Sequence, residues 1–143
     1  MISTDHFHPM LVHFPIALVV FGFLAECASL YFKKDANFSK LGFYLLLLGT
    51  LTAATALISG VFFTSELKGA AGEVQETHEL FAWITLSILL VTSALRVFLQ
   101  TQNEENSKLK WIAFVLYGLA TASVGITGYY GGTLVYNYMM PIN

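Results

Sequence analysis

The amino-acid sequence predicts an all-α integral membrane protein, built as a four-helix bundle. Of its 143 residues, 56% are hydrophobic and only 11% are charged, and the apolar residues gather into four long stretches. A soluble domain carries roughly 25% charged residues, because much of its surface faces water. The apolar stretches lack the period-two alternation of membrane β-strands, so they predict helices.

The four stretches are each long enough to cross a bilayer, which takes about 20 helical residues. They cover residues 9–32, 41–63, 80–99 and 111–130. Because the links between them are short, the whole chain is expected to be a single transmembrane domain within residues 1–143. The net charge of −2 excludes a basic surface for nucleic acid, and the single cysteine, Cys27, excludes an internal disulfide or a multi-cysteine metal site.

The first span begins at a distinctive motif, His-Pro-Met-Leu-Val-His-Phe-Pro, which starts at residue 8. Pro9 suits the first turn of a helix, where its missing N–H costs nothing. Pro15 lies inside the span and cannot donate to the carbonyl of Leu11, so we expect a kink just past His13. Irregular backbone at membrane depth is tolerated where it is buried or lines a cavity, which makes His13 a candidate ligand.

The second and fourth spans carry stripes of small residues, which let helix backbones approach closely in lipid. These stripes predict tight packing inside the bundle, contact with a second copy of the chain, or a flat cofactor against the glycines. We expect Gly118, Ala122, Gly125 and Gly128 to face the interior or a partner helix, with Gly125 and Gly128 as cofactor-binding candidates. The stripe of the second span comprises Gly42, Gly49, Ala53, Ala56 and Gly60.

His78 lies at the start of the third helix, just before its apolar span, and is followed by Glu79. Carboxylates often orient ligating imidazoles through a hydrogen bond, and Glu79 is the candidate for this role beside His78. Glu26 in the first span is the only carboxylate within a predicted span. It could relay protons, but we favour a simpler role in which it reaches water or pairs with Lys34.

The basic residues predict the orientation of the chain. Six of the seven lie in or beside the first and third links: Lys33, Lys34, Lys40, Arg96, Lys108 and Lys110. The positive-inside rule assigns these links to the cytoplasm, so both termini and residues 64–79 are expected on the outer side. All four histidines, at positions 6, 8, 13 and 78, then lie on that side.

A weak internal repeat accompanies this topology. A shift of 65 residues lays His13 on His78 and Gly60 on Gly125, which predicts two parallel, pseudo-repeated helical hairpins. In that register His13 and His78 lie at one depth on different helices. Two such imidazoles can hold a b-type haem through both axial positions of its iron. His13 and His78 are therefore the predicted axial ligands.

Other residues could replace one of these ligands. His8 is the reserve ligand; it lies five residues from His13, about 140° around an ideal helix, so the two do not share a face. Met10, Met139 and Met140 could also take the place of one imidazole.

The sequence resembles the DUF2231 family of small bacterial four-helix membrane proteins. The resemblance rests on residues 8–18, on His78 at the start of the third helix, and on the ending Gly-Gly-Thr-Leu-Val-Tyr at residues 131–136. It implies a bacterial inner-membrane protein, and the family's association with cytochrome-type redox proteins implies a cytochrome or respiratory-complex partner. Members commonly carry a His-Gly pair two residues after the tyrosine, whereas this chain has Tyr138 and Met139, so a site using that histidine would be altered or absent here.

Three classes of function remain open from the sequence. The first is a haem b-binding electron-transfer module or redox-complex subunit. The second is a structural or accessory subunit of a larger membrane complex without a cofactor. The third is binding or transport of a copper-type metal ion, since imidazole and thioether groups suit copper. The sequence shows no phosphate-binding loop and no nucleophile paired with a base, so it gives no support for an enzyme.

Overall fold

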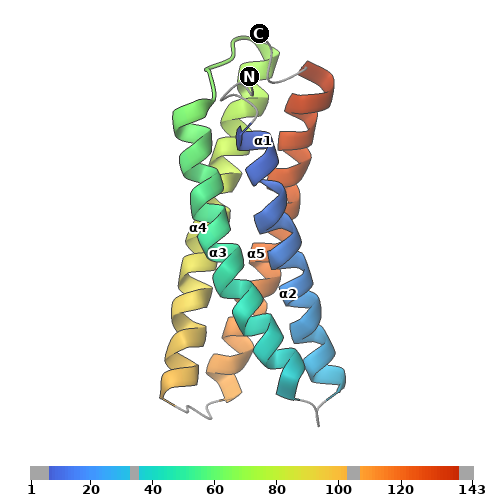
Figure 1. The fold of residues 1–143 in the computed structure, drawn as a ribbon, viewed down its shortest axis with the longest axis vertical. Helices are drawn as coiled ribbons and strands as arrows, with labels where there is room; N and C mark the ends of the chain where they lie inside the picture. Colours follow the sequence, from blue (N-terminus) through green and yellow to red (C-terminus); the bar gives the residue numbers. More distant parts are fainter. Residues whose placement is uncertain (1–6, 33–35, 103–106, 139–143) are drawn as a thin grey trace.

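The computed structural model describes residues 7–32, 36–102 and 107–138, and within these ranges the chain is helical, without strands. The elements are α1 (Phe7–Leu11), α2 (His13–Tyr31), α3 (Ala36–Phe63), α4 (Ala70–Thr101) and α5 (Ser107–Tyr138). Together α1 and α2 make the first of four crossings that are long and apolar enough to span a membrane. The crossings lie along one long axis (Figure 1), which confirms the all-α membrane bundle.

The first crossing is interrupted at Val12, where α1 ends and α2 begins. The break lies in the turn before Pro15, whose missing N–H leaves the carbonyl of Leu11 without its helical donor. The Val12 N–H still donates to the His8 carbonyl at 3.2 Å, so the two segments stay in line. The helix is therefore irregular near Pro15, as predicted. The break lies at Val12, before His13, and not just past His13.

The helices extend beyond the apolar stretches that predict them. α4 begins at Ala70, ten residues before the predicted span, and α5 continues to Tyr138. The added residues of α4 include alanine, glutamate and glutamine, which favour helix and tolerate the interfacial region of a bilayer. Only residues 64–69 remain as a link between α3 and α4, and Gly69 adopts a positive φ of 68° just before α4.

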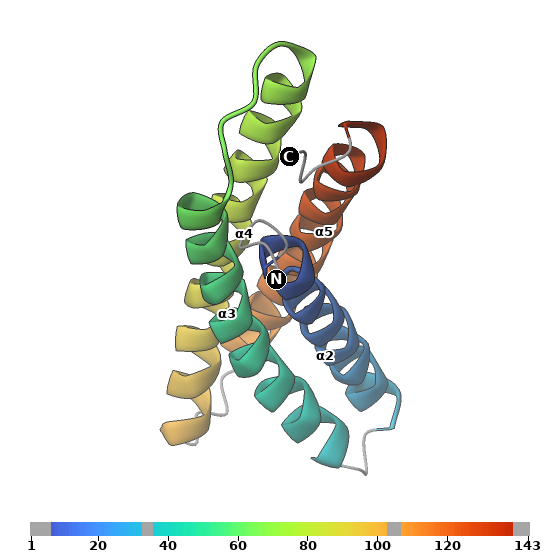
Figure 2. The ribbon, with the colours of Figure 1, turned by 45° about the horizontal axis from the view of Figure 1, so that its top comes forward.

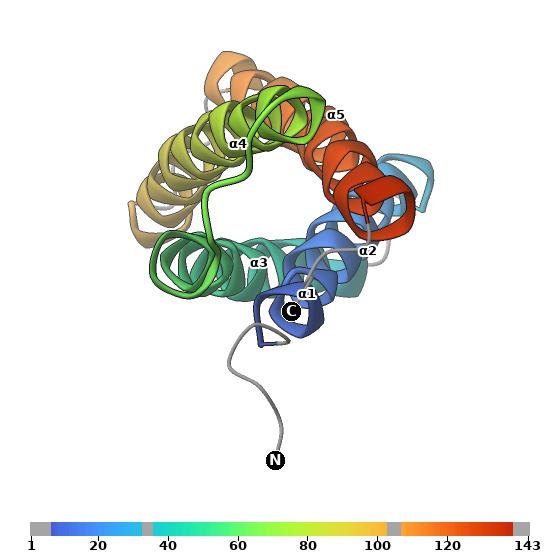
Figure 3. The same ribbon diagram turned by 90° about the horizontal axis from the view of Figure 1, so that it is seen from above.

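The bundle consists of two hairpins. The first crossing packs closely along α3, and α4 packs closely along α5, whereas the contacts of α3 with α4 and of α2 with α5 are less extensive. Viewed from an oblique angle (Figure 2) and from above (Figure 3), the crossings form a ring in which α2 lies diagonally opposite α4. Side chains that join α2 to α4 must therefore reach across the middle of the bundle.

Corresponding positions of the two hairpins are related by a shift of 70 to 71 residues. A shift of 70 takes Val19 of α2 to Leu89 of α4, and a shift of 71 takes Leu46 of α3 to Tyr117 of α5. All four of these side chains are almost completely buried and form the central core with Ala120 and Val124. The repeat of two hairpins is thus visible in the packing, but in a register five to six residues longer than the sequence identities indicate.

The small-residue stripe of α5 only partly faces the interior. A Cβ on Gly118 would lie 3.2 Å from Phe23, and one on Gly128 would lie 3.3 Å from Ile16. Ala122 and Gly125 instead lie on the exposed face, and nothing is within 4 Å of a Cβ placed on Gly125. The expectation that all four residues face inward is wrong for this pair, because the buried face of α5 follows Ala113, Tyr117, Ala120 and Val124. Self-association through the exposed part of the stripe stays a prediction.

Candidate functional site

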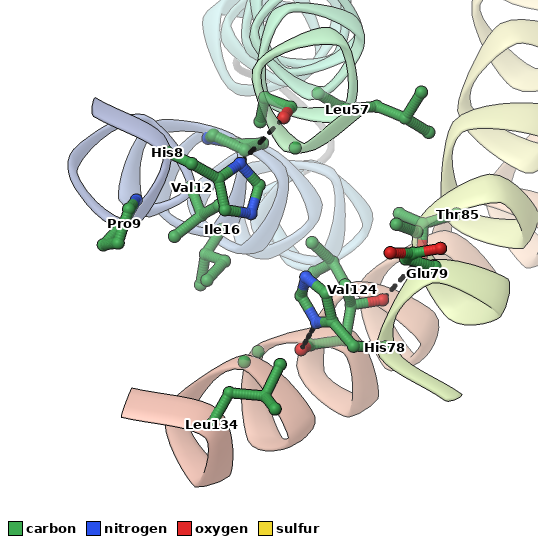
Figure 4. Close-up of a pocket in the computed structure, with 18 of the residues that line it drawn as sticks. His8, Pro9, Val12, Ile16, Leu57, His78, Glu79, Thr85, Val124 and Leu134 are labelled. Carbon is green, nitrogen blue, oxygen red and sulfur yellow. Dashed lines mark hydrogen bonds between the residues drawn. The ribbon is translucent and has the colours of Figure 1, made fainter. Parts of the chain in front are cut away.

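A cavity of about 400 Å³ lies in the end of the bundle where α1 begins and α5 ends. Its volume falls within the roughly 300–1,000 Å³ typical of cofactor and ligand sites. All four crossings contribute to its mainly apolar wall (Figure 4). The polar side chains that line it are His8, His13, Thr64, Gln75, His78, Glu79, Thr85, Thr127 and Tyr136.

Two histidines from different hairpins face one another in this cavity. The ring centres of His8 on α1 and His78 on α4 are 6.1 Å apart, and the ring planes are inclined by 81°. Both side chains are partly buried. A shift of 70 residues takes one to the other, so they occupy corresponding positions of the repeat.

Hydrogen bonds to carbonyl groups fix the tautomer that each ring adopts when it is neutral. His8 Nδ1 lies 3.1 Å from the Ala56 carbonyl oxygen and 2.9 Å from Ser59 Oγ. His78 Nδ1 lies 2.9 Å from the Thr127 carbonyl oxygen. A carbonyl oxygen only accepts, so each Nδ1 carries the hydrogen and each neutral ring keeps its lone pair on Nε2. Both Nε2 atoms are turned towards the space between the rings (Figure 4).

The two Nε2 atoms are acceptors without a donor. No hydrogen bond among the described residues reaches either of them, since the bonds of both rings run through Nδ1. Two lone pairs that face each other across an apolar space repel one another. The arrangement therefore favours an electron-pair acceptor between the rings, for which a metal centre is the usual partner of neutral imidazole in proteins.

Glycines support both rings in the same way. A Cβ on Gly60 would lie 3.0 Å from Cε1 of His8, and a Cβ on Gly131 would lie 3.1 Å from Cε1 of His78. A shift of 71 residues takes Gly60 to Gly131, and the same shift takes Ala56 to Thr127, the two carbonyl acceptors. The repeat thus reproduces the ring, its acceptor and the glycine beneath it.

The structure does not bring His13 together with His78, as the 65-residue register predicts. His13 is exposed at the edge of the cavity, and its Nδ1–H donates to the Pro9 carbonyl at 2.8 Å. The five-residue offset between His8 and His13 turns only one of them inward. That residue is His8, which the sequence places in reserve.

The remaining candidates are spread around the cavity or outside it. Glu79 lines the wall, but it accepts from Gln75 Nε2 at 3.3 Å, while His78 donates to Thr127 instead. Gly128 lines the cavity and Gly125 does not. Met10 is 62% exposed, and Met139 and Met140 lie outside the described residues.

The side chain of Gln75 forms hydrogen bonds with the link between α3 and α4 at the rim of the cavity. Its Oε1 accepts from the Leu67 N–H at 2.9 Å, and its Nε2 donates to the Ser65 carbonyl at 3.2 Å. The side chain is buried, so these bonds are shielded from water. The link is therefore tied to the first turns of α4, close to His78.

The opposite end of the bundle holds an ion pair that the sequence reasoning missed. Glu26 of α2 is 5% exposed and forms a salt bridge with Arg96 of α4, across the diagonal of the ring. A second contact joins Arg96 Nη1 to Glu26 Oε2 at 3.4 Å, and Nη2 also lies 3.4 Å from Ser39 Oγ. The expected partner, Lys34, lies outside the described residues, and Arg96 takes its place.

All four crossings meet at this ion pair. Gly42 of α3 leaves room for the carboxylate, since a Cβ there would lie 2.7 Å from Glu26 Oε1. The Tyr117 hydroxyl of α5 donates to the Gly42 carbonyl at 3.4 Å and occupies the space beside Gly22. The ion pair is buried among the four helices, whereas the histidine end contains the cavity.

Comparison with known proteins adds the family. A family model described as a predicted membrane protein, DUF2231, matches residues 4–142. The chain belongs to the DUF2231 family. No curated protein and no solved structure matches it. Membership confirms the resemblance found in the sequence, and the functional argument for this DUF2231 protein rests on the geometry of the site.

Proposed function

We propose that this protein is a haem b-binding electron-transfer module whose axial ligands are His8 and His78. The observation that carries the proposal is the pair of imidazoles that present Nε2 lone pairs to one another across an apolar cavity. Each ring is held by an Nδ1–H bond to a backbone carbonyl, which is the usual arrangement of metal-ligating histidines.

The separation of the rings fits one metal centre between them. A metal–nitrogen bond of about 2.0–2.1 Å, with each ring centre about 1.1 Å behind its nitrogen, separates two facing ring centres by about 6.2–6.4 Å. The ring centres of His8 and His78 are 6.1 Å apart. The separation of the two ring centres therefore agrees with ligation of one metal to within a few tenths of an ångström.

The number of donors favours haem over a bare metal ion. Among the residues that the structure describes, no three His, Cys, Asp or Glu side chains come together to hold a metal. A haem supplies four nitrogen ligands of its own and needs only two axial groups from the protein. A copper-type site with three or four protein ligands would need a further ligand beyond His8 and His78.

The cavity also has the form that a flat group needs. His8 and His78 belong to opposite hairpins, so a group between them lies between the hairpins. The wall includes the exposed side chains of Tyr136 on α5, Val61 on α3 and Trp83 on α4. A macrocycle wider than the bundle core can therefore extend towards the membrane lipid.

We place the site at the periplasmic face of a bacterial inner membrane. Lys40, Arg96, Lys108 and Lys110 lie in the end of the bundle opposite the histidines, and the positive-inside rule assigns that end to the cytoplasm. Haem bound between two imidazoles supplies one-electron transfer. The protein then exchanges electrons at its outer face with a membrane or periplasmic partner, such as a cytochrome or a respiratory complex.

Haem titration of the purified protein tests this function. We expect one haem per chain with a low-spin visible spectrum in the wild type. His8→Ala and His78→Ala should each give a high-spin spectrum or lose the haem, while His13→Ala, the matched control, should keep the low-spin spectrum. A well-folded wild type that takes up no haem would contradict the proposal and favour a structural subunit, and tight copper binding in its place would favour a metal carrier.

A further inference from the structure

His13 is not used by the haem site, although the same motif supplies it. It lies five residues inside the first crossing from His8, about 7.5 Å along the helix, and it is exposed on the outside of the bundle. Its Nδ1–H donates to the Pro9 carbonyl, so its Nε2 is a hydrogen-bond acceptor. Ionisable side chains within membrane spans are costly and tend to be functional, so a role for this imidazole is expected.

The wall that α5 contributes to the cavity includes three glycines, at positions 128, 131 and 132. α5 runs opposite to α2, and Gly128 contacts Ile16, so Gly132 lies one turn further out, at the depth of Val12 and His13. Nothing is within 4 Å of a Cβ placed on Gly132, and both Gly132 and His13 line the cavity. Gly132 therefore leaves an open slot in the cavity wall, at the depth of His13 on the neighbouring α2.

The other hairpin differs at the corresponding position. A shift of 70 residues takes His13 to Trp83, which also lines the cavity and is 55% exposed. An indole N–H donates and does not accept, and its ring is bulky. At this pair of corresponding positions, the side chain that can accept a hydrogen bond therefore lies on α2 and not on α4.

We propose that the slot between His13 and Gly132 binds the head group of a membrane quinol, with one quinol hydroxyl donating to His13 Nε2. A quinol is flat, dissolves in lipid and carries hydroxyl donors, which match the slot, its lipid-facing side and the acceptor. The inference rests on the proposed function, because it names the class of electron donor that would reach the haem site from the membrane.

Equilibrium binding of a short-chain 1,4-benzoquinol to the protein in lipid nanodiscs tests the inference, with partition into empty nanodiscs subtracted. We expect His13→Phe to weaken binding about three- to tenfold, as loss of one hydrogen bond implies. Gly132→Leu should fill the slot and abolish binding. Gly125→Leu, an exposed glycine of the same helix away from the cavity, and Trp83→Phe should leave binding within twofold of wild type.

The dimethyl ether of the same benzoquinol separates the hydrogen bond from general partition into lipid. It should bind the wild type more weakly than the quinol, and His13→Phe should not change its affinity. Equal binding of quinol and ether, or unchanged quinol binding by His13→Phe, would overturn the inference.

The two proposals fail separately. His78→Ala should lose low-spin haem and still bind the quinol, because the slot does not use His78. A wild type that binds quinol without haem would contradict the haem site alone, and one that binds haem without quinol would contradict the slot alone.

Discussion

Each end of the bundle brings together one pair of residues that occupy corresponding positions in the two hairpins, and the two pairs interact differently. At one end the repeat brings together His8 and His78, and at the other it brings together Glu26 and Arg96. Within each hairpin the two positions are 18 residues apart, which is five helical turns or about 27 Å. The same face of the same helices therefore carries both pairs, near opposite boundaries of the membrane.

The chemistry of each pair accounts for its surroundings: the ion pair is buried in tight packing, and the histidines line a cavity. A carboxylate and a guanidinium satisfy each other, so the hairpins meet at the ion pair and all four helices pack around it. Two neutral imidazoles that both present acceptors do not satisfy each other, and a cavity remains between them. A pair of identical residues at corresponding positions of the two hairpins thus leaves room for a bound group. A pair of oppositely charged residues joins the two hairpins.

Breaking the ion pair between Glu26 and Arg96 should have the largest effect on stability. Arg96→Gln leaves the buried Glu26 carboxylate without its counter-charge, which costs about 3–5 kcal/mol in comparable buried pairs. The free energy of unfolding in detergent should fall by that amount. The double variant Glu26→Gln with Arg96→Gln should recover most of the loss, and a single variant within 1 kcal/mol of wild type would contradict the joining role.

A smaller effect is expected where Tyr117 passes Gly22. A Cβ on residue 22 would lie 1.9 Å from the Tyr117 hydroxyl oxygen, so Gly22→Ala must displace the ring at a cost of about 1–3 kcal/mol. Tyr117→Phe removes the closest atom, and the unfolding free energies of the two single variants and the double variant should show favourable coupling. If the changes in unfolding free energy of the two single variants simply add in the double variant, the two residues are not in contact.

The glycines beneath the histidines test the end that contains the cavity. Gly60→Ala and Gly131→Ala each push a methyl group against a ligand ring, and haem affinity should fall about 5- to 150-fold in both, as 1–3 kcal/mol of overpacking implies. Gly125→Ala is the matched control, because its methyl meets open space. If only one of the two variants weakens haem binding, the rings are not equivalent.

Ser59→Ala should have the smallest effect. The His8 Nδ1–H loses the Ser59 hydroxyl but keeps the Ala56 carbonyl. Haem affinity should therefore change by no more than about 1 kcal/mol, measured by titration against the wild type. A complete loss of low-spin haem would show that the hydroxyl, and not the carbonyl, holds the ring.

The sequence predicts the four crossings well, because long apolar runs with few charges have no other stable arrangement in a chain of this size. It also predicts that basic residues gather at one end and histidines at the other. The pairing of the histidines was wrong because apolar helices align almost equally well in several registers. Helix periodicity predicts the ligand better. Glu26 must face inward in a membrane, and of the three histidines before it only His8 lies a whole number of helical turns away.

The ion pair was beyond reach from the sequence for a different reason. Arg96 lies near the end of a predicted span, where basic side chains commonly reach the lipid head groups. Its inward direction depends on the register between hairpins, which places it opposite Glu26 across the bundle. The 70-residue repeat relates the two positions, but nothing local to either residue indicates it.

The most direct test of the central claim, that His8 and His78 bind one iron, is electron paramagnetic resonance of the ferric protein labelled with ¹⁵N-histidine. We predict a low-spin signal with coupling to two histidine nitrogens. His8→Gly should reduce the coupling to one histidine, and added imidazole should restore the low-spin state, whereas His13→Gly should change nothing. A high-spin wild type, or loss of one coupling in His13→Gly, would contradict the ligand pair.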